Sequence, residues 1–528
     1  MPTASRMSAA ATRHAPTGMV AGADHLASAA GVAMLRDGGN AVDAAVAAAA
    51  VMAVTGPHLC GLGGDLFALV FDGDGPPKAL NASGRAGSGA DPVALRVEGH
   101  TMMPPQGDIR SVTVPGCVDG WLALHDRYGS LSLVEVLEPA EIYAATGFPA
   151  SPLLAAAIPF LDGVEGTEDF FTGTAVRTGD LIRRTGHART LDAIARHGRS
   201  GFYQGEFGEA LHELGRGLFT PDDLAKPLAD WVEPLTARAF GHDLWTIPPN
   251  SQGYLILLGA AVADGLDVPD DPADPKWAHL LVESARAAGH DRPYVLHEDA
   301  DVRPLLALEG VDARRAAISP DRAAALAWPA GPGGTTYLCA VDSDRIGVSL
   351  IQSNANGFGS KLFVPDLGIG LQNRGIGFSL EPGHPAEYAP GRRPPHTLCP
   401  AIVTRPDGSL RAVLGTMGGD SQPQILLQVL TRLLRHKEPA GSAIGAPRWT
   451  LRSSTGGGFD TWTVGALHVA LEAGCPSAWA AGLRERGHEV LEMPAGHTFG
   501  HAHVIEATER GLAGAADPRA VIGDAAGY

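Results

Sequence analysis

The chain has 528 residues, of which 45% are hydrophobic and 19% are charged, so it is long enough to bury a large core. Its formal net charge of −18 argues against a nucleic-acid-binding protein, which would need a basic surface. Its five cysteines are widely spaced, a pattern that favours free thiols in a reducing compartment over a disulfide framework.

The N-terminal region predicts a short strand and two helices. Residues 1–16 lack the apolar segment of a signal peptide. A strand at residues 19–23 precedes Asp24, which can cap a helix that ends at a glycine pair. Asn40 opens a second helix at residues 41–54, which is apolar on nearly all sides but too short to cross a bilayer. We therefore expect a cytoplasmic protein with no membrane partner.

A glycine turn at residues 61–65 leads into a strand at residues 66–71. Because no Lys-Ser/Thr pair follows and the turn precedes a strand rather than a helix, tight helix–strand packing is the expected reason for these glycines, rather than phosphate binding. A second strand at residues 80–86 contains Arg85 between small residues. Its planar guanidinium group could bind a carboxylate or form a surface ion pair, and the residues alone favour the ion pair.

The rest of the chain changes from helices to strands. Helices are predicted at residues 119–128, 131–146, 206–215, 254–263 and 277–290, and strands at residues 231–236 and 244–247. Later strands are predicted at residues 336–341, 346–352, 400–404 and 410–414, followed by a helix at residues 425–435. This order predicts an α/β fold, a four-layer αββα sandwich with two antiparallel sheets face to face.

The sequence Gly-Gly-Thr-Thr-Tyr at residues 333–337 opens the first of these later strands. The Thr335 hydroxyl can attack the carbonyl of Gly334, an N→O acyl shift can follow, and water can then split the chain. Thr335 would become a new N-terminus whose α-amine acts as the base for its own hydroxyl. The alternative is a plain junction between a loop and a strand, because this sequence is common.

Several further runs occur in an order that is typical of one known family. They are Gly38-Gly39-Asn40-Ala41-Val42-Asp43-Ala44-Ala45-Val46, Leu62-Gly63-Gly64, Gly201-Phe202-Tyr203-Gln204-Gly205, Pro248-Pro249-Asn250-Ser251-Gln252-Gly253, Gly334-Thr335-Thr336, Arg393-Pro394, Gly418-Gly419, Ala446-Pro447-Arg448 and Ala516-Asp517-Pro518-Arg519 with Gly527-Tyr528. Over nearly its whole length the chain resembles the γ-glutamyltransferase family of N-terminal-nucleophile (Ntn) hydrolases. The resemblance implies the Ntn-hydrolase form of the αββα sandwich.

The resemblance also implies that the chain is a zymogen that cuts itself between Gly334 and Thr335. The products would be a large piece (residues 1–334) and a small piece (residues 335–528) that stay associated.

Carried over by position, the family's catalytic roles fall on residues of both pieces. Thr335 is the nucleophile, and Ser353 replaces a threonine that assists it. Gly418 and Gly419 form the oxyanion hole, and Arg85 binds the α-carboxylate of the substrate.

The residues that recognise the substrate depart from the family's pattern. Ala355, Arg374 and Gly377 stand where typical members have an Asn, a Gln or Glu, and an Asp that hold the α-ammonium group of a γ-glutamyl substrate. His396-Thr397 replaces a Ser-Ser pair that binds the carboxylate end. An arginine in place of these groups disfavours a second cation.

We therefore expect Arg85 and Arg374 to bind an acyl group that carries carboxylate and lacks an α-amine, as in oxamate. Residues 371–375 and 417–420 are similar to the oxamate amidohydrolase branch of the family. The alternative is that Arg374 points elsewhere and Asp420 supplies the missing negative charge, which would make the chain a γ-glutamyltransferase or glutathione hydrolase.

Two other classes of protein remain open. His497, His501 and His503 lie close together in the sequence and could bind a metal, but they lack a paired Glu-x-x-His or CxxC motif, so satisfied or surface histidines are favoured. A catalytically silent binding or scaffold protein is the second. We expect no metal and no cofactor, a small-molecule amide as substrate, and homodimerisation as an open option.

Overall fold

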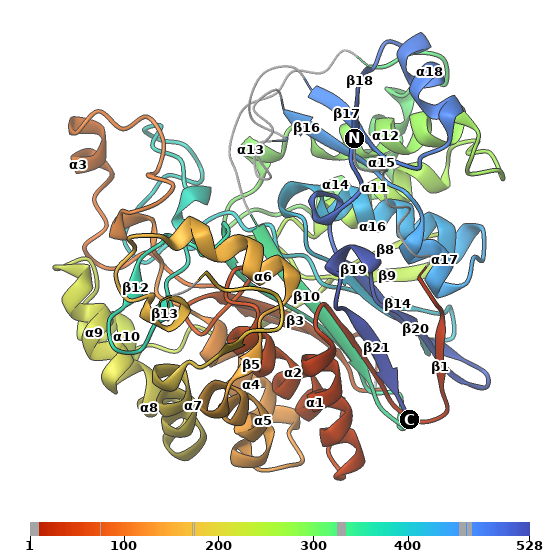
Figure 1. Cartoon of the computed structure of the whole chain (residues 1–528). Helices are drawn as coiled ribbons and strands as arrows, with labels where there is room; N and C mark the ends of the chain where they lie inside the picture. The colour runs from red at the N-terminus through yellow and green to blue at the C-terminus, as the bar shows by residue number, and fades with distance from the viewer. Residues whose placement is uncertain are drawn as a thin grey trace.

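The computed structural model describes residues 10–73, 75–171, 173, 175–324, 334–453, 461 and 467–528, and for Gly334 and Thr335 it describes the backbone alone. Two seven-stranded sheets lie face to face between two layers of helices (Figure 1). Every pairing within these sheets is antiparallel. The predicted four-layer αββα sandwich is therefore confirmed.

We name the two sheets by one strand of each. The β10 sheet contains, in spatial order, β21 (Asp524–Gly527), β2 (Met19–Gly22), β10 (Gly334–Val341), β11 (Gly347–Ala355), β3 (Asp65–Phe71), β4 (Lys78–Ala82) and β7 (Asp230–Val232). The β15 sheet contains β1 (Arg13–Ala15), β20 (Gly511–Ala515), β19 (Ala502–Thr508), β15 (Leu410–Thr416), β14 (Ala401–Thr404), β9 (His242–Thr246) and β8 (Leu235–Ala239). Strands that precede residue 334 and strands that follow it occur in both sheets.

Alternating side chains divide the core between the layers. On β10, Tyr337, Cys339 and Val341 face the β15 sheet, whereas Leu338 and Ala340 pack into the core on the other side. This period of two is the one that a strand buried on both faces imposes. The sandwich is therefore held by three apolar layers, one between the sheets and one beneath each layer of helices.

Helices cover the outer face of each sheet (Figure 1). Those on the side of the β10 sheet include α1 (His25–Arg36), α2 (Ala41–Thr55), α4 (Cys117–Tyr128), α5 (Leu133–Thr146), α7 (Thr185–His197), α8 (Arg199–Tyr203) and α9 (Glu206–Gly215). Those on the side of the β15 sheet include α11 (Tyr254–Asp264), α12 (Pro275–Gly289), α16 (Gln422–Leu430), α17 (Ala440–Gly445) and α18 (Ser477–Glu485).

Helix α2 is the most deeply buried element of the first helical layer, since each of its residues is buried. Asn40 caps it by accepting hydrogen bonds from the amides of Val42 and Asp43, and the Asp43 carboxylate accepts from the Asn40 amide. Asp24 caps α1 by accepting a hydrogen bond from the amide of Leu26. The sequence predicted both caps, because Asp and Asn side chains satisfy the free amides of a first turn.

Shorter elements complete the fold. A three-stranded sheet contains β16 (Trp449–Ser453), β17 (Leu467–Glu472) and β18 (Glu489–Met493), and two-strand pairs join β5 (Phe148–Pro149) to β6 (Leu181–Ile182) and β12 (Phe363–Val364) to β13 (Ile369–Gly370). The remaining helices are α3 (Pro92–Val97), α6 (Pro152–Ala157), α10 (Pro221–Ala225), α13 (Arg292–Val295), α14 (Arg303–Leu306) and α15 (Leu308–Ala316).

The five cysteines are free thiols, as the sequence predicted. Among the described residues, none of the helices has the length and apolar character that a membrane crossing requires.

Candidate active site

The predicted nucleophile lies at the start of a central strand. On β10, Gly334 pairs with Ala355 of β11 and Thr336 pairs with Gln352, with an irregularity between the two pairs. Thr335 on one strand and Ser353 on the other therefore fall within the same short irregular stretch. The side chain of Thr335 lies outside the part of the chain that the structure describes, so the site is built here from its neighbours.

Two glycines let the turn before β3 approach this stretch closely. A Cβ added to Gly64 would lie 2.5 Å from the carbonyl oxygen of Ser353, and one added to Gly63 would lie 2.3 Å from that of Gly370. Only glycine fits at such distances. Close packing is therefore the role of this turn, but the prediction that it packs a helix against a strand is wrong, because its neighbours are the end of β11 and β13.

Arg374 connects Ser353 to a third segment of the chain. It begins the short 3-10 helix η4 (Arg374–Gly377) and is buried. Its guanidinium donates hydrogen bonds to Ser353 Oγ at 3.2 Å and to Thr397 Oγ1 at 3.1 Å. The predicted substrate-binding residues Arg374 and Thr397 thus lie together beside Ser353.

Arg374 keeps its positive charge although it is buried. Burial lowers the pKa of Arg374 to about 10, the nearby Arg292 adds to this decrease, and Asp65 and Asp420 oppose it. Because this pKa remains well above 7, the guanidinium group is protonated at neutral pH. A buried cation of this kind is a strong attractor for an anionic ligand.

Asp420 lies against a second arginine that the sequence did not single out. Arg292, at the start of α13, lies 3.2 Å from Asp420 Oδ1 through its Nη2 atom, and both side chains are buried. The Asp420 charge is therefore shared between Arg292 and Arg374. No sequence motif marks Arg292, because it lies 82 positions before Arg374 (374 − 292 = 82) and comes close only through the fold.

The predicted oxyanion glycines form a tight turn directly after β15. Gly418 has a φ of 141° and Gly419 a φ of 58°, which are backbone conformations that favour glycine. The side-chain amide of Gln252 donates through Nε2 to the carbonyl oxygens of Gly419 and Thr397, at 3.0 Å each. It therefore links the turn to Thr397, which contacts Arg374. This turn continues into η5 (Gly419–Ser421), which carries Asp420.

His396 lies beside the site but is occupied by structural contacts. Its Nδ1 atom accepts from the Leu398 amide at 3.2 Å, so its Nε2–H donates to Asp65 Oδ2 at 3.1 Å. Burial first, and the Arg374 charge second, lower the pKa of His396 to about 3, so the ring is neutral. Asp65 also accepts hydrogen bonds from the Gly84 amide and from Gln372, which makes it an organising residue that sequence reasoning missed.

Arg85 contacts a different set of groups from Arg374. It forms an ion pair and hydrogen bond with Glu298, donates to the carbonyl oxygen of Gly391 at 2.9 Å, and lies 3.8 Å from Asp230. Its side chain is 34% exposed. The second arginine beside Arg374 is Arg292, and the acyl-binding role of Arg85 stays a prediction.

The turn at residues 417–421 contributes residues to the linings of two cavities. One, of about 250 Å³, is lined by Arg292, Arg374, Thr397, Asp420 and Gly377, together with Tyr294 and Phe378. The other, of about 600 Å³, is lined by Gly418 together with Met417, Phe160, Phe358, Arg452 and His497. The first cavity is therefore small and charged, whereas the second is larger and mixed in character.

Ala355 and Gly377 add no charge to the first cavity. Ala355 is buried with a φ of 72°. A Cβ added to Gly377 would lie 2.5 Å from the carbonyl oxygen of Pro395, so this position does not accommodate a carboxylate side chain without movement of the backbone.

The three histidines that raised a metal hypothesis occupy different environments. His501 and His503 are buried, and burial lowers their pKa values to about 3 and about 4, respectively. His503 accepts a hydrogen bond from the Asp517 amide at 3.2 Å. His497 instead lines the larger cavity.

The sequence model of the family described as gamma-glutamyltranspeptidase matches residues 27–528. The chain belongs to this family. It is 37% identical over 533 residues to the oxamate amidohydrolase proenzyme of Klebsiella pneumoniae, covering 97% of this chain and 98% of that relative. It is 36% identical to the glutathione hydrolase-like YwrD proenzyme of Bacillus subtilis, covering 95% of this chain and 97% of the relative.

A solved structure has the same fold over the full length. The crystal structure of a cephalosporin acylase from Bacillus halodurans superposes with a TM-score of 0.89 at 34% identity, covering 100% of this chain and 98% of the other. Membership of the gamma-glutamyltranspeptidase family makes this chain an enzyme with the Ntn-hydrolase fold, a hydrolase or acyltransferase, rather than a silent scaffold.

Proposed function

We propose that this enzyme cuts itself between Gly334 and Thr335 and then uses Thr335 as the nucleophile of an amide hydrolase. The names of two relatives as proenzymes support self-processing. The position of Thr335 at the start of a central strand pair, within the irregular stretch that also contains Ser353, also supports it.

The proposed reaction has two steps. The Thr335 hydroxyl attacks the amide carbonyl, its proton passes through the Thr335 α-amine to the leaving amine, and the C–N bond breaks. Water then attacks the acyl ester and releases the acid. The amides of Gly418 and Gly419 would stabilise the negative charge on the carbonyl oxygen. The larger cavity beside Gly418 provides a space through which the amine can leave.

The substrate that we propose has a small acyl group that carries a carboxylate and lacks an α-amine, as oxamate does. The observation that carries this proposal is the buried part of the cavity of about 250 Å³, where two arginines, Arg292 and Arg374, outnumber one carboxylate, Asp420. The other carboxylate of the lining, Glu381, is exposed. The net positive charge of the buried part favours an anion. The small volume favours a short acyl group over a long one.

A second candidate is γ-glutamyl transfer or hydrolysis. The Asp420 carboxylate lines the same cavity and could hold an α-ammonium group. Its ion pair with Arg292 at 3.2 Å weighs against this, because a substrate ammonium group would have to compete with a cation already in place.

Mass spectrometry and two substrates test the proposal together. We expect two chains, one beginning at Thr335, with release of ammonia from oxamate and little turnover of a γ-glutamyl anilide. Thr335→Ala should leave one chain of 54.5 kDa with neither activity. Two chains that turn over only the γ-glutamyl anilide would overturn the proposal of an acyl group without an α-amine. An uncut chain that is active would overturn the proposal that Thr335 is an N-terminal nucleophile.

A further inference from the structure

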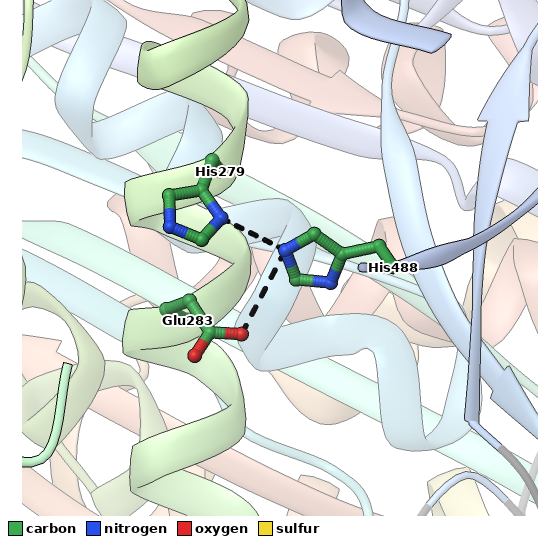
Figure 2. Close-up of side chains that lie close together, drawn as sticks. All are labelled: His279, Glu283 and His488. Atoms are coloured by element: carbon green, nitrogen blue, oxygen red, sulfur yellow. Dashed lines mark hydrogen bonds and ion pairs between the residues drawn. The ribbon is translucent and has the colours of Figure 1, made fainter. Parts of the chain in front are cut away.

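Three buried side chains that are not part of the candidate active site meet between α12 and the turn that precedes β18 (Figure 2). His279 and Glu283 lie one turn apart on α12, and His488 lies directly before β18. His279 Nδ1 is 2.8 Å from His488 Nε2, which is 3.8 Å from Glu283 Oε1. One ligand atom from each residue lies within 4.8 Å of the others.

Neighbouring groups hold these side chains by hydrogen bonds, as the partners of metal ligands do. His279 Nε2 lies 2.8 Å from the carbonyl oxygen of Ser319, so this nitrogen carries the proton and Nδ1 presents its lone pair to the cluster. Glu283 Oε2 accepts from the Ala324 amide at 2.8 Å, and Arg286 bonds to Oε1. Metal-ligating histidines and carboxylates are characteristically held by such outer partners.

The donor atoms also suit a metal. The cluster brings together two imidazole nitrogens and one carboxylate oxygen, all buried. Two neutral imidazoles and one carboxylate are the donor set that zinc and its neighbours among the divalent transition metals accept.

We propose that His279, Glu283 and His488 bind one divalent transition-metal ion of the zinc class. The ion takes the place of the hydrogen bond between the two rings, and His488 moves its proton from Nε2 to Nδ1, so no net proton is released. Two Zn–N bonds in tetrahedral geometry place the nitrogens roughly 3.3 Å apart, which requires the rings to separate by about half an ångström.

The site would join parts of the chain that the proposed processing separates. His279 and Glu283 precede Gly334, and His488 follows it. The segment at residues 319–324 lies over the cluster, because Ala323 donates to the carbonyl oxygen of Arg486 at 2.7 Å and Arg486 donates to that of Pro320 at 3.2 Å. This linking role rests on the proposed function, whereas metal binding itself does not.

Metal titration of the full-length protein tests the site. The protein as purified is treated with EDTA, dialysed, and titrated with ZnCl2 by calorimetry and with CoCl2 by visible absorption. We expect one ion per chain and the absorption of tetrahedral cobalt. His279→Gln, Glu283→Gln and His488→Gln should each weaken zinc binding about 10- to 100-fold or more. The control is His468→Gln, a histidine of the neighbouring β17 that pairs with Glu489 and lies outside the cluster.

Each result of the titration either supports or overturns the proposed metal site. Loss of one zinc equivalent in the three cluster variants but not in His468→Gln supports the site. Failure of the wild-type protein to bind zinc or cobalt would overturn it and leave a hydrogen-bonded histidine pair. Binding that persists in all variants would also overturn it, because the ion would then lie elsewhere. The wild-type cobalt spectrum needs no variant to fold, and substrate turnover is not part of the readout, so failure here is separate from failure of the proposed function.

Discussion

Arg374 is a buried cation whose hydrogen bonds reach both Ser353 and Thr397. A buried charge is costly unless nearby groups or a ligand compensate it. Asp420 and Asp65 provide part of this compensation, and Arg292 reduces it. An anionic acyl group in the adjoining cavity would complete it.

Substituting Arg374 by Gln tests this electrostatic role. A hydrogen bond to a charged group contributes about 1.5–3 kcal/mol, so kcat/KM for oxamate should fall roughly 10- to 100-fold. Turnover of any γ-glutamyl amide should fall less, because such a substrate brings its own cation. Steady-state kinetics on both substrates measure the difference, with thermal melting as a check that the variant folds. Equal losses on both substrates would contradict the arginine-based pocket.

The substitution Asp420→Asn distinguishes between the two candidate substrates, because its expected effects on their turnover are opposite. The change keeps the shape of the side chain but removes the anion that competes for Arg292. The kcat/KM for oxamate should be retained or rise by up to roughly fivefold, which corresponds to about 1 kcal/mol. Residual γ-glutamyl turnover should disappear if it depends on this carboxylate. A loss of oxamate turnover would show instead that Asp420 supports the reaction directly.

At the scale of elements, the site depends on close contact between the turn before β3 and the end of β11. Gly64 allows this contact, since an added Cβ would meet the Ser353 carbonyl oxygen at 2.5 Å and the Asn354 side chain at 2.8 Å. Backbone atoms cannot move away as a flexible side chain could. The position of Ser353 is therefore set by a residue that has no side chain.

Gly64→Ala should accordingly displace the end of β11. Overpacking of this kind costs about 1–3 kcal/mol, and we expect self-cleavage to slow so that the uncut chain accumulates. A denaturing gel over time after expression measures this. Gly259→Ala on α11 is the matched control, because its added Cβ would lie 3.7 Å from Leu427 Cδ2, an ordinary contact. Normal processing of Gly64→Ala would mean that the Ser353 position is not critical.

The sequence predicted the helices and strands better than it predicted the tertiary contacts between them. Period-two and helical patterns located β10, β11, α2 and α12, and the caps at Asp24 and Asn40 marked helix starts, because these signals are local. The approach of Arg292 to Asp420 and the pairing of Arg85 with Glu298 are not local. These contacts depend on how separate loops pack together, and the sequence pattern of one loop does not predict which other loop it will contact.

In the cluster of His279, Glu283 and His488, one part could also be predicted from local sequence and the other part could not. The spacing of His279 and Glu283 on a predicted helix places them on one face, and this signal was present in the sequence. The third member comes from a turn more than two hundred positions later, at the edge of a small sheet that the sequence did not reveal.

At the scale of the whole molecule, buried neutral histidines link stability to pH. Burial lowers the pKa values of five of them to about 3 or about 4: His58, His396, His488, His501 and His503. In the unfolded chain each would protonate near 6.5. The unfolded state therefore binds more protons below that pH, and the stability present above pH 6.5 is lost as the pH falls.

We expect the protein to unfold cooperatively between about pH 5 and 6. Each histidine removes about 1.4 kcal/mol per pH unit below its unfolded pKa, so the five together act strongly. Burial raises the pKa values of Asp119, Asp169 and Asp342, which opposes the trend in part. Urea unfolding at a series of pH values measures the slope. Stability that is unchanged from pH 7 to pH 5 would contradict the burial of these rings.

The interleaving of strands has a consequence for how such an enzyme can be made. In the β10 sheet, β2 lies between β21 and β10, so strands from before and after residue 334 alternate as direct neighbours. If the two pieces were separately encoded, each would emerge with exposed strand edges that pair readily with the wrong chain. An unbroken precursor gives every edge its partner at high local concentration. Under the proposed cleavage between Gly334 and Thr335, the bond that is cut would first have kept the two pieces together while their strands paired correctly.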